Sequence, residues 1–306
     1  MRIAHISDIH LFCSHCIGHE SILNKRLIGL ANWYLRRRRK VDIRILDIFA
    51  EKMQELEPDV LCITGDIVHL GFRGEFQRAR KWLKGLRSIC PVKIVPGNHD
   101  AYLSECIHRI KKSLGDFFSI KGARVSGKAA LEELFPVVDV DEKSRVALIG
   151  LSTATPTGLI HATGCLGEGQ IQRLGGVLKD LGQKGLFRVI LIHHPPIHGC
   201  VSKRRSLIDL DGLEKLVDKT GAEVFLFGHS HRRLVLPSNG NLSKRIYLNA
   251  PSITSISKDP VKRAGFFLID IDRKGRKWNV ACKDFILGEK QDSFISGKDH
   301  FWRLCQ

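Results

Sequence analysis

Five short segments rich in Asp, His and Asn carry the side chains best suited to chemistry. In chain order they are Asp8-Ile9-His10, Gly65-Asp66, Gly97-Asn98-His99-Asp100, His193-His194-Pro195-Pro196 and Gly228-His229-Ser230-His231. Imidazole, carboxylate and amide groups are ligands for divalent transition metals, and these segments hold enough of them for two ions side by side. Two adjacent divalent cations ionise water near neutral pH and neutralise phosphate oxygens. The pattern therefore predicts a two-metal site able to break phosphate ester bonds.

Short apolar runs lead into these segments, as strands do in α/β folds. They span residues 2–7, 59–64, 92–95, 188–192 and 223–227. Such folds place their chemistry on the loops that follow the carboxyl ends of strands. Between the runs, apolar residues recur with helical spacing around 45–56 and 210–217. This alternation predicts a layered α/β sandwich.

Spacing inside the segments indicates which ligands act together. Asp8 and His10 stand two residues apart at the end of an extended run, so their side chains point to the same side and can hold one ion. The same geometry applies to His229 and His231. Two ions about 3.5 to 4 Å apart need a carboxylate that bridges them. Asp66 is the natural candidate for that bridge.

These five blocks, in this order, resemble the signature of the calcineurin-like metallophosphoesterase superfamily: D-x-H, G-D-x-x-(D/H), G-N-H-(D/E), H and G-H-x-H. The resemblance covers residues 1 to about 250. It implies a metal-dependent phosphoesterase with a layered α-β-β-α sandwich of two mixed sheets.

The resemblance also implies a ligand set for two metal ions. One ion would be held by Asp8, His10, Asp66 and His231, and the other by Asp66, Asn98, His193 and His229. In the family the ligand His stands two residues before the Pro, which favours His193 over His194. The optional acidic position of the second block is His69 here. Such ligands accept Mn²⁺, Fe, Zn²⁺ and others, and we expect Mn²⁺.

His99 follows the predicted ligand Asn98 directly, so its side chain should project in another direction, toward the substrate. There an imidazolium could stabilise the transition state or protonate the leaving oxygen. The family pattern implies that Asp100 orients that ring and stabilises its charge. His99 and Asp100 are therefore the predicted catalytic residues.

The rest of the chain shows no linker, repeat or low-complexity tract, which favours a single domain over residues 1–306. Residues 101 to about 145 are expected to form a helical insertion, followed by a strand at 145–150. From 232 to 282 the pattern is β-rich, with four runs separated by turn signals. We expect these runs to be antiparallel strands that complete a second sheet.

Lys and Arg number 49 against 32 Asp and Glu, and the net charge of +17 indicates an anionic partner. Seven of the cations lie in a basic amphipathic insertion at about 22–40, where Leu27, Leu30 and Tyr34 follow helical spacing. Such a segment suits an interfacial helix on an anionic bilayer, with a core-packed helix that has a solvated basic end as the alternative. We expect residues 23–40 to contact an anionic membrane surface.

The insertion resembles that of a superfamily branch containing the chlamydial-type UDP-2,3-diacylglucosamine pyrophosphatase. It shares the pattern Lys-Arg-Leu-Ile-Gly, then Asn-Trp, then four arginines. This resemblance implies hydrolysis of UDP-2,3-diacylglucosamine to UMP and a lipid monophosphate. A cyclic-nucleotide phosphodiesterase is an alternative, because the segments at 97–100 and 193–196 also resemble that class. A nuclease ranks below both, because the sequence contains no recognisable nucleic-acid-binding module.

Three cations, Lys203, Arg204 and Arg205, follow the His193 segment closely. We expect them to clamp a substrate phosphate, with a solvated loop as the equally weighted alternative. The nine cysteines are odd in number and scattered, which is not the pattern of a disulfide framework. The first strand leads directly to Asp8, so a cleaved leader would remove a ligand. The expected location is the cytoplasm, at the inner face of the membrane.

Overall fold

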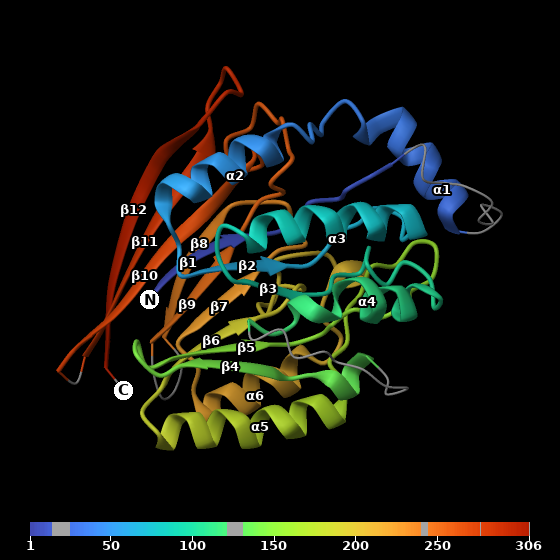
Figure 1. The fold of residues 1–306 in the computed structure, drawn as a ribbon. Coiled ribbons are helices and arrows are strands. Elements are labelled where there is room, and N and C mark those ends of the chain that lie inside the picture. Colours follow the sequence, from blue (N-terminus) through green and yellow to red (C-terminus); the bar gives the residue numbers. More distant parts are fainter. Residues whose placement is uncertain (14–24, 121–130, 240–243, 276, 306) are drawn as a thin grey trace.

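The computed structural model describes residues 1–13, 25–120, 131–239, 244–275 and 277–305. Within them, twelve strands form two six-stranded sheets, each with parallel and antiparallel pairs (Figure 1). The first sheet has the order β12-β11-β10-β1-β2-β3, and the second has the order β4-β5-β6-β7-β9-β8. The predicted α/β fold with two mixed sheets is confirmed.

The first sheet combines three parallel strands with a C-terminal antiparallel extension. Its members are β1 (Arg2–Ile6), β2 (Val60–Thr64), β3 (Val92–Val95), β10 (Gly265–Lys274), β11 (Lys277–Leu287) and β12 (Phe294–Cys305). β1 pairs in parallel with β2 and antiparallel with β10. The first strand and the last three strands of the chain therefore belong to the same sheet.

The second sheet has a parallel centre and antiparallel edges. It contains β4 (Val137–Asp141), β5 (Val146–Gly150), β6 (Phe187–Leu191), β7 (Val224–Phe227), β8 (Leu234–Asn239) and β9 (Lys244–Asn249). β5, β6, β7 and β9 pair in parallel, while β4 and β8 are antiparallel to their neighbours.

Helices cover the outer faces of both sheets (Figure 1). α2 (Ile45–Leu56) and α3 (Arg73–Arg87) lie on the first sheet, and α5 (Glu168–Gln183) and α6 (Leu210–Thr220) lie on the second. Strand alternation explains the layers, because successive side chains point to opposite faces. In β5, Val146 and Leu148 join the core between the sheets, whereas Ala147 and Ile149 join the core under α5 and α6.

Two expectations about elements were wrong in part. The four predicted C-terminal runs are strands, but β10 and β11 extend the first sheet, and β9 lies parallel to β7. Residues 101–145 contain α4 (Cys106–Leu114) as expected, yet β4 lies where helix was predicted. The sheet assignment failed because a strand's own pattern shows which side chains are buried, not which neighbouring edge it joins. Residues 121–130 of this region lie outside the described residues.

The basic insertion forms α1 (Lys25–Asn32) and a short π-helix, η2 (Trp33–Arg37). Both lie at the end of the molecule toward which β1 and β2 run (Figure 1). The Arg26 side chain is buried and donates to the carbonyls of Leu70 (3.1 Å) and Gly71 (3.0 Å). This contact fixes α1 beside the loop that follows β2.

Two further features bear on the sequence expectations. Among the described residues, no helix combines the length and apolar character needed to cross a bilayer. Six cysteines in the described part of the chain are free thiols, but Cys13 is disulfide-bonded, which the scattered cysteine pattern did not predict.

Candidate metal centre

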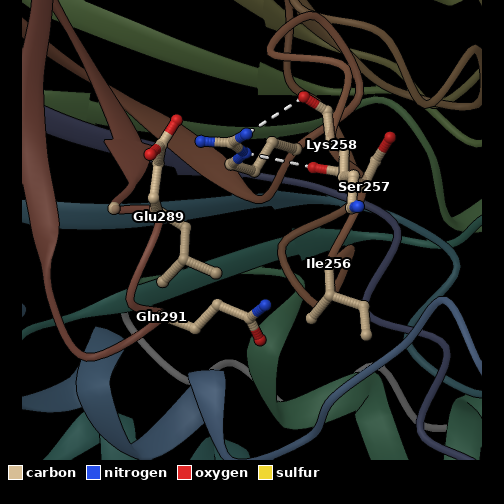
Figure 2. Close-up of a pocket in the computed structure, with 8 residues that line it drawn as sticks. Ile256, Ser257, Lys258, Glu289 and Gln291 are labelled. Atoms are coloured by element: carbon tan, nitrogen blue, oxygen red, sulfur yellow. Dashed lines mark hydrogen bonds between the residues drawn. The ribbon is translucent and has the colours of Figure 1, made fainter.

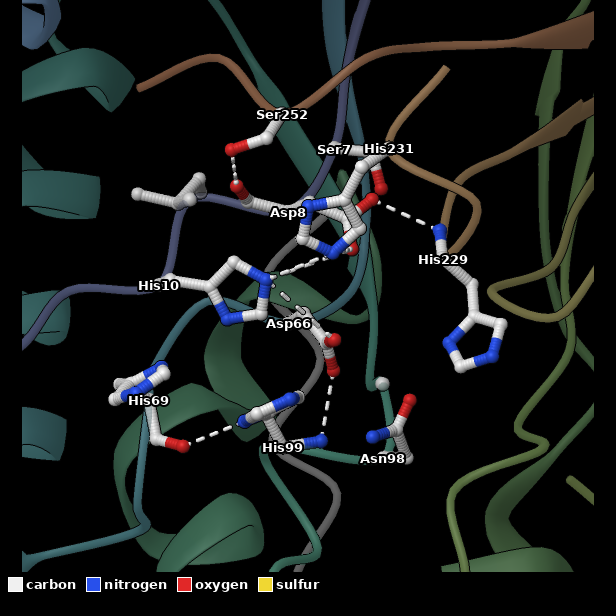
Figure 3. Close-up of polar contacts among 12 residues, drawn as sticks. Ser7, Asp8, His10, Asp66, His69, Asn98, His99, His229, His231 and Ser252 are labelled. Carbon is white, nitrogen blue, oxygen red and sulfur yellow. Dashed lines mark hydrogen bonds and ion pairs between the residues drawn. The ribbon is translucent and has the colours of Figure 1, made fainter. Parts of the chain in front are cut away.

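All seven predicted metal ligands meet where strands of both sheets end, and Figure 3 labels six of them, His193 being the exception. They follow β1 (Asp8, His10), β2 (Asp66), β3 (Asn98), β6 (His193) and β7 (His229, His231). Six of the seven are buried, with His231 partly exposed. Parallel strands bring their carboxyl ends to one edge, so loops far apart in sequence become neighbours.

The ligand loops have unusual backbone conformations. Five of the seven residues have positive φ: Asp8 (55°), His10 (51°), Asp66 (53°), His229 (64°) and His231 (53°). Residues with a Cβ rarely adopt this region, and such strain collects at functional sites. The loops are held by backbone hydrogen bonds between them, such as Asp8 N–H to Gly65 O (3.1 Å) and His10 N–H to Asp66 O (2.9 Å).

One group of donors gathers around Asp8. Its Oδ1 lies 3.2 Å from Nε2 of His231 and 3.7 Å from Nε2 of His10. Its Oδ2 accepts a hydrogen bond from the amide of His229 (2.8 Å), which fixes the carboxylate. Asp66 completes the group, with Oδ2 3.9 Å from Nε2 of His10. Asp8, His10, Asp66 and His231 are thus close enough to hold one cation.

A second group gathers around His193. Its Nε2 lies 3.4 Å from Oδ1 of Asp66 and 3.1 Å from Oδ1 of Asn98. The His229 ring lies beside it, with centroids 5.1 Å apart. Asp66 therefore faces both groups, one carboxylate oxygen toward each. Burial alone would raise the pKa of Asp66, but the neighbouring His193 and His99 hold it well below the ordinary value.

The donor set fits divalent cations. Asp8 Oδ1 and His229 Nε2 are buried and have no hydrogen-bond partner. Leaving a buried polar atom unpaired costs about 1–3 kcal/mol, so such atoms call for an explanation. Coordination to a cation satisfies the lone pairs of both, and mixed His, Asp and Asn donors suit first-row transition metals.

His193 and His194 differ in what their ring nitrogens contact. His193 donates from Nδ1 to the carbonyl of Thr64 (2.7 Å), which points Nε2 toward Asp66. This arrangement orients a metal-binding imidazole. His194 has both nitrogens engaged by protein, Nδ1 with Thr153 Oγ1 (2.7 Å) and Nε2 with Ala162 O (3.2 Å). The geometry favours His193 as the ligand.

Asp100 does not act on His99 in the expected way. The Asp100 carboxylate accepts hydrogen bonds from the amides of Ile67 (2.9 Å), Val68 (3.0 Å) and Gly97 (2.8 Å), which ties two ligand loops together. His99 is oriented instead by its Nδ1, which lies 2.6 Å from the carbonyl of His69.

The imidazolium expected at His99 also requires correction. Burial lowers the pKa of His99 to about 4, so the ring is neutral near pH 7. With Nδ1–H donated to a carbonyl, Nε2 is left as an acceptor. His69, whose role was open, stacks on this ring at a centroid distance of 5.2 Å. His99 thus offers the site a hydrogen-bond acceptor at Nε2.

Of the three predicted phosphate-clamping cations, one reaches the site. Lys203, Arg204 and Arg205 form a short 3-10 helix, and Arg205 donates to the carbonyl of His229 (2.5 Å). The side chains of Lys203 and Arg204 are exposed. A cation that the sequence reasoning missed, Arg37, contacts His10, His69 and His231. It stands in a run of four arginines, and nothing in that run distinguishes it from its neighbours.

A separate cavity of about 370 Å³ lies away from these ligands (Figure 2). Arg263 lines it and donates to the carbonyls of Ser257 (3.0 Å) and Lys258 (3.0 Å). No predicted site residue lines this cavity.

Comparisons with known proteins agree with this geometry. The family model for calcineurin-like phosphoesterase matches residues 1–233. The chain is 28% identical over 237 residues to a glycerophosphodiester phosphodiesterase, GpdQ, of Enterobacter lignolyticus, covering 76% of this chain and 71% of the relative. It is 23% identical over 230 residues to a probable cyclic nucleotide phosphodiesterase of Synechococcus, covering 73% and 76%. Among solved structures, a dimetal phosphatase from Danio rerio superposes with a TM-score of 0.64 at 14% identity, covering 98% of each chain.

Proposed function

The chain belongs to the calcineurin-like phosphoesterase family and is a metal-dependent phosphoesterase, and we propose that it hydrolyses a phosphodiester or pyrophosphate bond with two Mn²⁺ ions. The observation that carries the two-metal proposal is Asp66, whose two carboxylate oxygens face two separate groups of donors. Asp8, His10 and His231 would hold one ion with it, and Asn98, His193 and His229 the other.

The side chains around these ligands have distinct tasks. Two divalent cations, when bound, activate water for in-line attack on phosphorus and neutralise the phosphate oxygens. Asp100 holds the Asp66 and Asn98 loops at a fixed separation through three backbone amides. His99 presents its Nε2 as a hydrogen-bond acceptor beside His10, with ring centroids 4.6 Å apart. Arg205 brings a positive charge to the edge of the site.

The favoured substrate is UDP-2,3-diacylglucosamine, with UMP and a lipid monophosphate as products. Support comes from the insertion, which combines a cation at the metal ligands with apolar side chains in solvent. Leu27, Ile28 and Leu35 are 50%, 54% and 78% exposed. An apolar surface next to a phosphate site suits a substrate whose acyl chains stay in a membrane. A cyclic nucleotide is the second candidate, because one relative is named a probable cyclic nucleotide phosphodiesterase.

Substrate choice is testable with the purified protein. UDP-2,3-diacylglucosamine, cyclic AMP, bis(4-nitrophenyl) phosphate and single-stranded DNA are each incubated with Mn²⁺ and with a chelator. We expect UMP release from the lipid substrate, loss of that release with chelator, and at least slow turnover of the artificial diester. Turnover of cyclic AMP without UMP release would replace the lipid proposal with the nucleotide one, and no turnover of any substrate would contradict both.

Membrane contact through residues 23–40 is a separate part of the proposal. It places the enzyme on the cytoplasmic face of an anionic membrane, where the cations near η2 attract acidic headgroups. Flotation with vesicles containing phosphatidylglycerol should retain the wild type. A variant with Leu27, Ile28 and Leu35 changed to Ser should lose that retention while it still turns over bis(4-nitrophenyl) phosphate. Equal flotation of both proteins would contradict membrane contact by this segment.

A further inference from the structure

Arg37 reaches the candidate metal centre from the basic insertion. Its Nη2 lies 3.4 Å from Nε2 of His10 and 3.4 Å from Nε2 of His231, and its Nη1 lies 3.2 Å from Nδ1 of His69. Among the described residues, no acidic side chain comes within the 4.0 Å that would make an ion pair with it. The contacts of this guanidinium are therefore with imidazole rings, rather than with a carboxylate.

The position of Arg37 is fixed from both sides. Ahead of it, the Trp33 ring packs on Phe12 and His69, with centroids 4.4 and 4.8 Å apart. After it, the carbonyl of Lys40 accepts from the amide of Ile256 (3.0 Å). The segment that contains Ile256 is itself bound to the first ligand loop, because Ser252 Oγ donates to the carbonyl of Asp8 (2.6 Å). Arg37 is thus placed by the fold, unlike its exposed neighbours in the same run.

The contacts of Arg37 use the same atoms that would bind a metal ion. A guanidinium has five N–H donors and no acceptor, so it meets the histidines at their lone pairs. The Nε2 lone pairs of His10 and His231 are those that face Asp8. They cannot serve a cation and Arg37 together. When the centre is loaded, the guanidinium must take other partners within reach.

Charge indicates what those partners are. Two divalent cations bring four positive charges to a site whose ligands supply two carboxylates, from Asp8 and Asp66. Arg37 and Arg205 add two more positive charges around the same ligands. Cations crowded in a partly buried site repel strongly unless an anion lies between them. A substrate whose phosphate groups carry two negative charges relieves this excess better than a singly charged phosphodiester.

We propose that Arg37 is a phosphate-binding residue of this enzyme, which clamps a doubly charged phosphoryl or pyrophosphoryl group against the metal centre and selects such substrates over singly charged diesters. The inference rests on the proposed two-metal function and goes further by assigning a substrate contact to the insertion. Arginine suits this task because its planar fork binds two phosphate oxygens at once.

The test measures anion binding rather than turnover alone. Inorganic phosphate, mostly a dianion at pH 8, and dimethyl phosphate, a monoanion, are titrated by calorimetry into the Mn²⁺-loaded wild type and the variants Arg37→Gln and Arg37→Lys. Lys179→Gln, an exposed change on α5, is the matched control for the loss of one charge. We expect Arg37→Gln to weaken phosphate binding about 10- to 100-fold, the size of a charge-assisted contact. Dimethyl phosphate binding should change much less, and Arg37→Lys should lie between.

Two further measurements keep the result decisive. Mn²⁺ affinity of Arg37→Gln should equal or exceed that of the wild type, because the guanidinium competes for His10 and His231. Unchanged phosphate affinity, or loss of Mn²⁺ from Arg37→Gln, would overturn the inference; the latter would make Arg37 a support for the ligands instead. Turnover of bis(4-nitrophenyl) phosphate by the wild type is measured in the same preparation. Its absence would contradict the proposed function, while its presence together with a negative Arg37 result would contradict only the inference.

Discussion

The two adjacent histidines at 193 and 194 allow a stringent test of the metal centre. We compare His193→Ala with His194→Ala, which remove the same side chain from neighbouring buried positions. His194 makes two hydrogen bonds, to the buried hydroxyl of Thr153 and to the partly buried carbonyl of Ala162, and its loss removes the partner of both. At about 1–3 kcal/mol for each buried unpaired group, we expect His194→Ala to lower the free energy of unfolding by about 2–5 kcal/mol. That cost should be nearly the same with and without Mn²⁺.

The destabilisation caused by His193→Ala should, in contrast, be larger with Mn²⁺ than without it. It removes two hydrogen bonds, to Thr64 and Asn98, so its cost in the presence of chelator should resemble that of His194→Ala, about 2–5 kcal/mol. It also removes a nitrogen that faces Asp66 and Asn98. Removing a group that only orients a metal ligand lowers the affinity for the metal about 10- to 100-fold. Loss of the ligand itself should therefore weaken the binding of one ion by at least about 100-fold. This loss reduces the stabilisation by saturating metal by about 2.7 kcal/mol.

The assay is urea unfolding of both variants and the wild type, each with chelator and with excess Mn²⁺, followed by turnover of bis(4-nitrophenyl) phosphate. The wild type should gain stability on addition of Mn²⁺, His194→Ala should gain as much, and His193→Ala should gain clearly less and lose turnover. A His194→Ala protein that loses the metal-dependent gain, beside a His193→Ala protein that keeps it, would refute the assignment of ligand and support.

Four other outcomes are expected. Asp66→Ala should bind fewer than two Mn²⁺ ions per chain by metal analysis, because both ions share this carboxylate, and its kcat should fall by at least about 1,000-fold. Two bound ions with normal turnover would contradict the bridging role of Asp66. Gly97→Ala would press a Cβ against the amide and carboxylate of Asp66, so we expect turnover to fall even where circular dichroism shows a folded protein. Arg205→Ala should raise KM for an anionic substrate about tenfold, because Arg205 contacts a ligand loop. Arg204 is exposed, so Arg204→Ala should leave KM nearly unchanged. Equal effects of the two substitutions would contradict a role for Arg205 in substrate binding. Burial raises the pKa of Glu75 to about 8, well above its value in the unfolded chain, so between these two values the folded state holds a proton that the unfolded state releases. The free energy of unfolding should therefore fall as pH rises from about 4.5 to 8 and then level off. In urea unfolding across this range, Glu75→Gln should show a flatter dependence on pH than the wild type.

Much of the site could be predicted because its residues are marked locally. Each ligand follows a short apolar run, and in an α/β fold such runs end at one shared edge. The types of residue at those positions, carboxylate, imidazole and amide, indicate the chemistry without any knowledge of distance. The spacing also predicted that Asp8 acts with His10 and that His229 acts with His231. The structure brings the first pair to one group of donors but divides the second, because His231 joins the group around Asp8 while His229 lies beside His193. All four residues lie beyond their strands with positive φ, so the loops and not an extended strand set these directions.

Roles that depend on contacts across the chain were predicted less well. Asp100 stands next to His99 in sequence, yet it bonds to amides of two loops, because the turn directs its carboxylate inward while the His99 ring turns to the carbonyl of His69. Arg37 and its neighbour Arg36 look alike in sequence. Only the packing of Trp33 and the ties at Lys40 direct one of them to the ligands.

The sequence by itself determined the chemical type of this protein: the ligand types, their order, the strand ends that carry them, and the family to which they correspond. The tertiary structure alone decided which sheet the C-terminal strands join and which cation of a basic run reaches the centre, and it supplied the physical reason for preferring His193 to His194, a choice that the family pattern had already made. The physical reason is the distance along the chain over which each property is determined. Side-chain chemistry and strand periodicity are set over a few residues, whereas sheet edges, free lone pairs and charge around a site depend on segments that meet only when the chain is packed.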